Sequence, residues 1–161
     1  MNHSLKLRIA EPEDAERITE VINSAFRKAE EFFIDSDRID TASVLNLLAA
    51  GTFLLAEGEQ LLEGCVYLER RAQGRAYLGL LAVAPDSQQS GVGSLLMQGA
   101  EDYCRGLGLG FMDIKIVNLR KELTGFYRRR GYIEIGTSPF PSEVQTKLAV
   151  HFIDMSKPLT S

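Results

Sequence analysis

The sequence predicts an α/β domain in which a mixed, mostly antiparallel sheet of seven strands is flanked by helices. A first segment alternates apolar and basic residues, as a strand does, and two helix-like segments follow it. Three closely spaced strand-like segments come next, and they predict an antiparallel meander because their connections are too short for crossover helices. Helix-like and strand-like segments alternate after that, so the predicted order is βααβββαβαββ.

The amino-terminal third is expected to contain one strand and two helices. Residues Leu5–Ala10 have the period of a strand, and a proline followed by two acidic residues then opens an amphipathic helix. The segment Lys28–Arg38 has no clean period. Asp40 or Thr41 is suited to cap a second helix, and Gly51 to end it.

The rest of the chain supplies the remaining strands and helices. We expect strands at Phe53–Glu57, Leu62–Glu69, Arg75–Ala84, Leu109–Val117, Tyr132–Thr137 and His151–Ser156, and helices at Gly91–Gly106 and Leu119–Arg130. No repeat, low-complexity stretch or linker interrupts them. The prediction is therefore one domain spanning residues 1–161.

Composition narrows the class of protein. With 161 residues, 45% of them hydrophobic and 25% charged, the chain resembles an average globular domain. Its net charge of −4 argues against a nucleic-acid partner. The two cysteines and two histidines lack the spacing of metal ligands, so no metal site is expected. The absence of a signal-like or membrane-spanning apolar run predicts a cytoplasmic protein with no membrane partner.

A glycine-bearing turn, QQSGVGSLL starting at Gln88, lies between a predicted strand and a predicted helix. A dinucleotide fold would need a third glycine where Leu96 stands, and a P-loop would need a lysine where Ser94 stands. The remaining pattern places free N–H groups at a helix N-terminus, which suits a pyrophosphate. The alternative is a plain loop in which Gly91 and Gly93 ease close packing.

This segment resembles motif A of the GNAT superfamily, the acyl-CoA-dependent N-acetyltransferases, whose signature is Gln or Arg, two residues, Gly, one residue, then Gly or Ala. The resemblance also covers the preceding LLAVAPDSQ. A second block is similar to the family at Asn118, Glu122-Leu123, Phe126-Tyr127 and Gly131-Tyr132. The element order is that of the family as well, so the similarity spans essentially the whole chain. It implies the GNAT fold, splayed at strands 4 and 5.

The resemblance implies that acetyl-CoA binds where those two strands splay apart. The backbone of the fourth strand would bond the pantetheine and the thioester carbonyl, and the glycine turn would receive the pyrophosphate. The implied cofactor-binding residues are Leu81, Ala82, Val83, Gln88, Gln89, Ser90, Gly91, Val92, Gly93, Ser94, Asn118 and Tyr127. Alternatives to ligand binding remain open. The strand around Leu81–Val83 could simply be buried, and Asn118 could only cap the helix beginning at Leu119.

The resemblance also makes Tyr127 the catalytic acid that protonates the departing CoA thiolate. The alternative is a core tyrosine on the apolar face of its helix. The general base stays open, because Tyr77 stands where several members carry a glutamate and a phenol is a poor base near neutral pH. Candidates are Glu30, Glu31, Glu69 and His151. Each could equally be a solvated surface residue, and some members manage without a dedicated base.

The implied function is transfer of the acetyl group of acetyl-CoA to a primary amine of a small-molecule or amino-acid-like acceptor, by direct attack in a ternary complex. The alternative is a CoA-ligand-binding sensor or interaction module without transfer activity, which Tyr77 in place of glutamate would favour. We expect Lys28–Arg38 and Ser138–Val150 to line the acceptor pocket. Arginines of the run Arg128–Arg130 should stabilise a helix C-terminus, with one or two near the acidic ligand. A homodimer is implied by the family alone.

Overall fold

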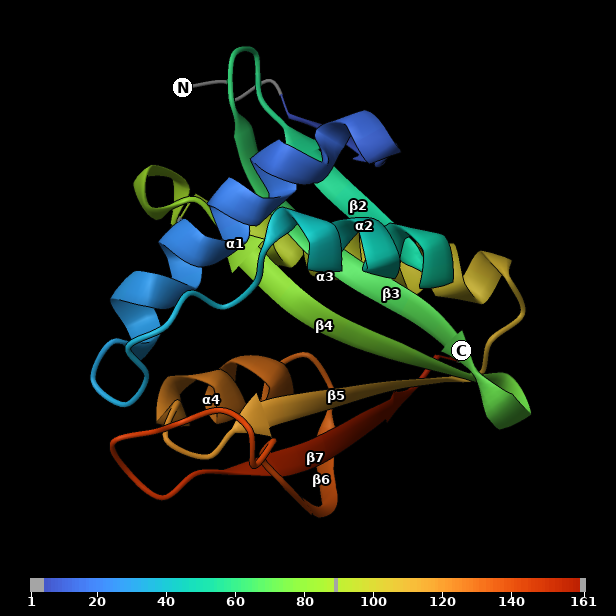
Figure 1. The fold of residues 1–161 in the computed structure, drawn as a ribbon. Coiled ribbons are helices and arrows are strands. Elements are labelled where there is room, and N and C mark those ends of the chain that lie inside the picture. Colours follow the sequence, from blue (N-terminus) through green and yellow to red (C-terminus); the bar gives the residue numbers. More distant parts are fainter. Residues whose placement is uncertain (1–4, 89, 160–161) are drawn as a thin grey trace.

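A computed structural model describes residues 5–88 and 90–159, and its elements follow the predicted order (Figure 1). The strands are β1 (Lys6–Ile9), β2 (Thr52–Glu57), β3 (Leu62–Arg71), β4 (Arg75–Val83), β5 (Phe111–Val117), β6 (Ile133–Pro139) and β7 (His151–Pro158). The α-helices are α1 (Ala15–Glu30), α2 (Thr41–Ala50), α3 (Val92–Gly106) and α4 (Lys121–Arg128). Gln89 lies outside the described residues. Within the described ranges, no helix combines the length and apolar character needed to cross a bilayer.

The strands form one seven-stranded sheet in the order β1-β2-β3-β4-β5-β7-β6. Only β4 and β5 run parallel among the paired strands, and the other pairs are antiparallel. The predicted mixed sheet of the GNAT fold is therefore confirmed. The pairing of β4 with β5 stops at Leu78 and Ile114, although both strands continue. Figure 1 shows the two arrows diverging toward their carboxyl ends.

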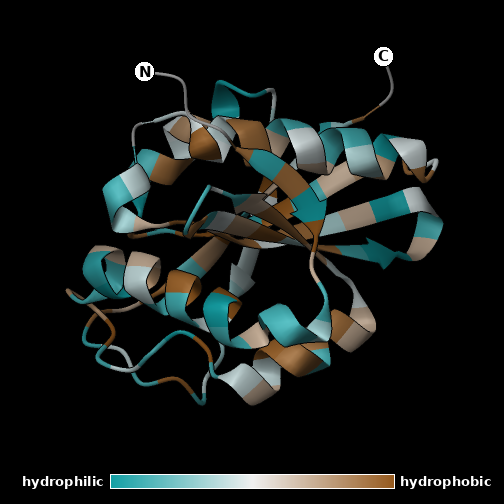
Figure 2. Ribbon diagram, turned by 90° about the horizontal axis from the view of Figure 1, so that it is seen from above, coloured by the Kyte–Doolittle hydropathy of each residue, from teal (hydrophilic) through white to brown (hydrophobic). Residues whose placement is uncertain are grey.

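Helices cover both faces of the sheet, because successive side chains of a strand point to opposite faces. In β2, Phe53 and Leu55 pack in the core under α1 and α2, whereas Leu54 and Ala56 pack in the core under α3. All four are buried. In Figure 2 the apolar strands lie between two layers of helices whose outward faces are more hydrophilic.

A third, small apolar cluster joins two loops to the carboxyl end of β5. It contains Phe33 and Ile34 from the segment after α1, together with Val117, and Phe152 of β7 packs against it. The loop between β6 and β7 also docks on this segment, since the backbone N–H of Lys147 donates to the Phe33 carbonyl at 2.8 Å. The two loops predicted to line the acceptor pocket therefore touch.

The second half of the chain departs from prediction around α4. The helix begins at Lys121 rather than Leu119, because Arg120 has a non-helical backbone with φ −92° and ψ 68°. The alternative in which Asn118 caps this helix is not observed, since Arg120 occupies the N-cap position. Its Oδ1 accepts the backbone N–H of His151 at 2.9 Å, and its own N–H donates to the His151 carbonyl at 2.9 Å. Asn118 thus prolongs the pairing of β5 with β7.

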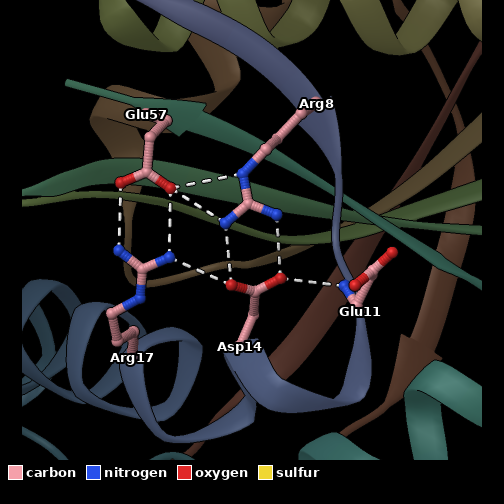
Figure 3. Close-up of polar contacts among 5 residues, drawn as sticks. All are labelled: Arg8, Glu11, Asp14, Arg17 and Glu57. Carbon is pink, nitrogen blue, oxygen red and sulfur yellow. Dashed lines mark hydrogen bonds and ion pairs between the residues drawn. The ribbon is translucent and has the colours of Figure 1, made fainter. Parts of the chain in front are cut away.

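A network of four charged side chains fastens β1, the start of α1 and β2 to one another (Figure 3). Arg8 donates to both carboxylate oxygens of Asp14, at 2.9 and 2.7 Å, and Arg17 bonds Asp14 and Glu57, each at 3.0 Å. The backbone N–H of Glu11 adds a bond of 2.8 Å to Asp14. Asp14 is buried. The hydrogen bonds from Arg8 are the main reason that the pKa of this carboxyl lies well below its usual range, since burial alone would raise it.

The network predicts an acid-sensitive contribution to stability. Because the folded-state pKa of Asp14 is lowered, its contribution is present above an unfolded pKa of about 4 and is lost as pH falls further. We expect Asp14→Asn to lower the free energy of unfolding by about 2–3 kcal/mol at pH 7. Urea unfolding should show this difference narrowing between pH 4 and pH 3. Glu20→Gln, an exposed change on α1, serves as control; equal losses at both pH values would contradict the assignment.

Candidate active site

The site is built on the point where β4 leaves β5. Beyond Leu78 the two strands no longer pair, and the register between β3 and β4 shifts over the same stretch. Leu80 lies at this shift with φ 52°, a left-handed conformation that a leucine rarely adopts. A bulge of this kind bends its strand and increases the local twist. The bend therefore opens the sheet between the carboxyl ends of β4 and β5.

Peptide groups of β4 face this opening. Val83 lies opposite Gly64, and the N–H of the next residue, Ala84, donates to a carbonyl of β3 at 2.8 Å. In an antiparallel pair this pattern turns the N–H and C=O of Val83 away from β3. By alternation Leu81 does the same, while the Ala82 carbonyl points toward β3. The three predicted residues are thus separated, with Leu81 and Val83 facing the opening.

The glycine turn forms the N-terminus of α3. Gly91 has φ 88° and ψ 5°, and a side chain added there would meet no atom within 4 Å, so the turn faces open space. The first N–H groups of a helix have no acceptor within the helix. The Gln88 side chain donates to the Val83 carbonyl at 3.3 Å, and the Ser90 hydroxyl donates to the carbonyl of Ser87. These bonds hold the turn against the end of β4.

A cation stands beside this helix N-terminus. The guanidinium of Arg130 bonds the Ser94 hydroxyl and lies 3.9 Å from the centre of the Phe126 ring. Of the predicted arginine run, Arg130 is thus the member placed beside the turn, while Arg128 forms an ion pair with Glu134 at 2.5 Å. The N–H groups of the turn and one guanidinium together suit a phosphate-bearing group.

Tyr127 of α4 is buried in the core that also contains the apolar residues of α3. Its ring contacts those of Phe126 and Tyr132 edge-on, at 5.0 and 5.7 Å between centroids. No hydrogen bond to its phenol is found among the described residues, and the side chain as a whole is buried. Burial raises the pKa of Tyr127, although the charges of Arg120 and Arg130 act in the opposite direction. The phenol is protonated at neutral pH and can donate a proton.

Tyr77, which stands where several family members carry glutamate, is half-buried on β4. The Arg71 guanidinium lies 4.4 Å from the centre of its ring. Gly79 leaves room for that ring, because a side chain at this position would lie 2.8 Å from it. Burial raises the pKa of Tyr77, so the phenol stays neutral and is unsuited to act as a base.

Three of the four candidate bases have little to support them. Glu69 accepts the Tyr67 hydroxyl at 2.7 Å and the Arg71 side chain at 2.9 Å, and these bonds, the first most strongly, lower its pKa. Glu31 and His151 are exposed.

Glu30 differs from these because it is buried at the end of α1. One of its oxygens lies 3.2 Å from Arg120, and burial raises its pKa against the opposing charges of Arg38 and Arg120. A cavity of about 210 Å³ lies here, lined by Phe26, Arg27, Glu30, Glu31, Ile34, Asp35, Ser36 and Arg38. Ile34 belongs to the cluster that includes Val117, so the cavity lies beside the carboxyl end of β5.

The structure thus places the sequence-predicted residues in two groups. The turn and the end of β4 lie together, and Val83 and Phe126 both approach Gly93, at 3.8 Å from a side chain built there. Asn118 lies apart, at the end of β5. Sequence reasoning did not single out Arg38 or Arg120, since neither belongs to a motif and only the fold brings them to Glu30.

Comparison with known proteins gives a family match. The model of the acetyltransferase (GNAT) family matches residues 15–132. An acetyltransferase of the GNAT family from Staphylococcus aureus Mu50 superposes with a TM-score of 0.78 at 22% identity, over 98% of this chain and 100% of that one. Ard1 from Thermoplasma volcanium superposes with a TM-score of 0.80 at 17% identity, over 98% of this chain and 99% of that one. PaiA N-acetyltransferase from Thermoplasma acidophilum, solved in complex with coenzyme A, gives 0.78 at 20%, over 96% and 99%. No curated protein sequence matches the chain significantly.

The left-handed turn before α3 predicts that glycine is required at position 91 for backbone reasons. We expect Gly91→Ala to lower the free energy of unfolding by about 1–2 kcal/mol, although the space for a methyl group is open. Gly106→Ala on the same helix has equal space and no positive φ, so it should be neutral or slightly stabilising. Chemical denaturation compares the two; equal effects would exclude a conformational cause.

Proposed function

This chain belongs to the acetyltransferase (GNAT) family and is an acyltransferase, and we propose on that premise that it moves the acetyl group of acetyl-CoA to the primary amine of a small acceptor. The observation that carries the proposal is the opening between β4 and β5. Its edge presents the peptide groups of Leu81 and the N–H of Val83, whose carbonyl accepts the Gln88 side chain, and a helix N-terminus stands at the end of β4. An extended ligand with amide groups and a pyrophosphate has the chemistry to use both.

The proposed donor site follows from these contacts. The β4 edge would pair with the pantetheine amides as an added strand does, and the α3 N-terminus with Arg130 would receive the pyrophosphate. Asn118 has its Oδ1 engaged by His151, which leaves its amide N–H groups to donate to the pantetheine. The proposed donor-binding residues are Leu81, Ala82, Val83, Gln88, Gln89, Ser90, Gly91, Val92, Gly93, Ser94, Asn118, Tyr127 and Arg130.

The proposed reaction is a direct transfer within a ternary complex. The neutral amine nitrogen bonds to the thioester carbonyl carbon, the carbon–sulfur bond breaks with its electron pair going to sulfur, and the nitrogen loses its extra proton to water. Tyr127 gives its proton to that sulfur and regains one from solvent; its phenol is protonated at neutral pH, as a general acid must be. Glu30 is proposed as the base that takes the ammonium proton through water, since burial raises the basicity of its carboxylate.

Thiol release from acetyl-CoA, measured over a panel of amines, tests transfer directly. Calorimetry with acetyl-CoA measures binding separately. Release that depends on an added amine supports the proposal. Tight binding of acetyl-CoA without turnover on any amine would instead favour the sensor or interaction module, for which Tyr77 in place of glutamate is the motivating feature.

The role of Tyr127 as acid predicts a selective loss of turnover. We expect Tyr127→Phe to lower kcat by about 10²–10⁴-fold, because the departing thiolate loses its proton donor, while the Kd of acetyl-CoA changes little. Tyr103→Phe, whose hydroxyl lies 3.4 Å from that of Thr52 near the other end of α3, is the matched control. A kcat equal to that of the parent protein would remove Tyr127 from the catalytic step.

The role of Glu30 as base predicts a change in pH dependence. The rate of the parent protein should rise with pH as Glu30 ionises, at a pH above the usual pKa of a glutamate. Glu30→Gln should lower kcat by about 10²-fold or more and abolish that step in the pH profile. Glu59→Gln, in the exposed turn between β2 and β3, is the control. Retention of the same step by the Gln variant would argue against Glu30.

A further inference from the structure

The cavity beside Glu30 carries charges of both signs, and part of them is neutralised within the protein. Arg27 forms an ion pair with Asp37 at 2.5 Å. Asp35 is paired with Lys147 at 2.9 Å. These four groups satisfy one another at the surface, so they leave little net charge for a ligand.

The remaining charged groups of the cavity are Arg38, Glu30 and Glu31. Within residues 5–88 and 90–159, no carboxylate pairs with Arg38, whose guanidinium lies 5.4 Å from the centre of the Phe26 ring. No hydrogen bond or ion pair to the Glu31 side chain is found there either. Glu30 is bonded to Arg120 through one of its two oxygens only. One guanidinium and two carboxylates are thus available on the wall of the same cavity.

The cavity also lies close to the proposed reaction centre. Glu30 is bonded to Arg120, which follows Asn118 by two residues at the end of β5. Arg38 contributes to the electrostatic environment of both Glu30 and Tyr77, and Tyr77 precedes the last paired residue of β4. A molecule in the cavity is therefore next to the opening between the two strands.

We propose that the acceptor is a small amine that also carries a carboxylate, with Arg38 binding the carboxylate, Glu31 binding the ammonium group and Glu30 reaching that group through a water molecule. This inference rests on the proposed function. A guanidinium matches a carboxylate with two parallel hydrogen bonds. The volume of about 210 Å³ is below the range of about 300–1,000 Å³ typical of drug-sized ligands, which favours a molecule the size of an amino acid. Arg38 would also repel the second ammonium of a diamine.

The test uses amino acids, their primary amides and linear diamines as acceptors in the thiol-release assay. The parent protein should prefer each amino acid over its amide by about tenfold or more in kcat/KM. Arg38→Gln should raise KM for the amino acid by about 10–100-fold and leave KM for the amide within about twofold. Arg38→Lys keeps the charge without the paired N–H groups, so its KM for the amino acid should lie between that of the parent protein and that of Arg38→Gln. Arg70→Gln, an exposed arginine of β3, is the matched control.

The outcomes separate this inference from the function on which it rests. Amides or diamines used as well as amino acids, or an equal effect of Arg38→Gln on acid and amide, would overturn the inference and leave acetyl transfer standing. If acetyl-CoA binds but none of the amines is acetylated, both the inference and the proposed function are overturned. Thermal melting and the Kd of acetyl-CoA for each variant exclude unfolding as the cause of a raised KM. If Arg38→Gln melts below the assay temperature, the Arg38→Lys series decides by the same criterion.

Discussion

The constraint on which the rest of this structure depends is that β4 and β5 stop pairing at Leu78 and Ile114 while both strands continue. Peptide N–H and C=O groups near a protein core need partners, and a parallel pair that separates leaves a row of them on each strand. The bulge at Leu80 is the local origin of the separation, since it turns β4 away from its neighbour. Cores on both faces of the sheet keep the two strands in this arrangement although they do not bond each other.

The elements around the opening divide it into two chemically different halves. On one side stand the N-terminus of α3 and Arg130, which present N–H donors and positive charge. On the other side Glu30, Arg38 and Arg120 form a group of mixed charge at the end of α1. Tyr127 is buried between these regions with a raised pKa. The halves are thus suited to different partners, one polyanionic and one small and polar.

Much of the architecture could be predicted from local sequence patterns. The alternation in β1 and the glycine turn before α3 depend on residues near each other in the chain, and such signals survive in a single sequence. The contacts that complete the site join residues far apart in the chain, so a single sequence does not reveal them. Glu30 meets Arg120 across 90 positions and Ser94 meets Arg130 across 36, so neither pair has a spacing that a motif could record. Asn118 is a further example of a contact that the local sequence does not record. Its residue type suits a helix cap, but its side chain bonds the backbone of His151 in β7.

The small cluster of Phe33, Ile34 and Val117 is separate from the two larger cores, and it joins the loop after α1 to the loop between β6 and β7. These loops are tied to the sheet by a few apolar side chains and by backbone bonds such as that from Lys147 to Phe33. Substitutions of exposed residues along the loops should therefore leave the packing that supports α3 and β4 undisturbed. For protein engineering, exposed residues of the stretch after α1, such as Asp35 and Ser36, can be randomised while Phe33 and Ile34 are kept as its anchor.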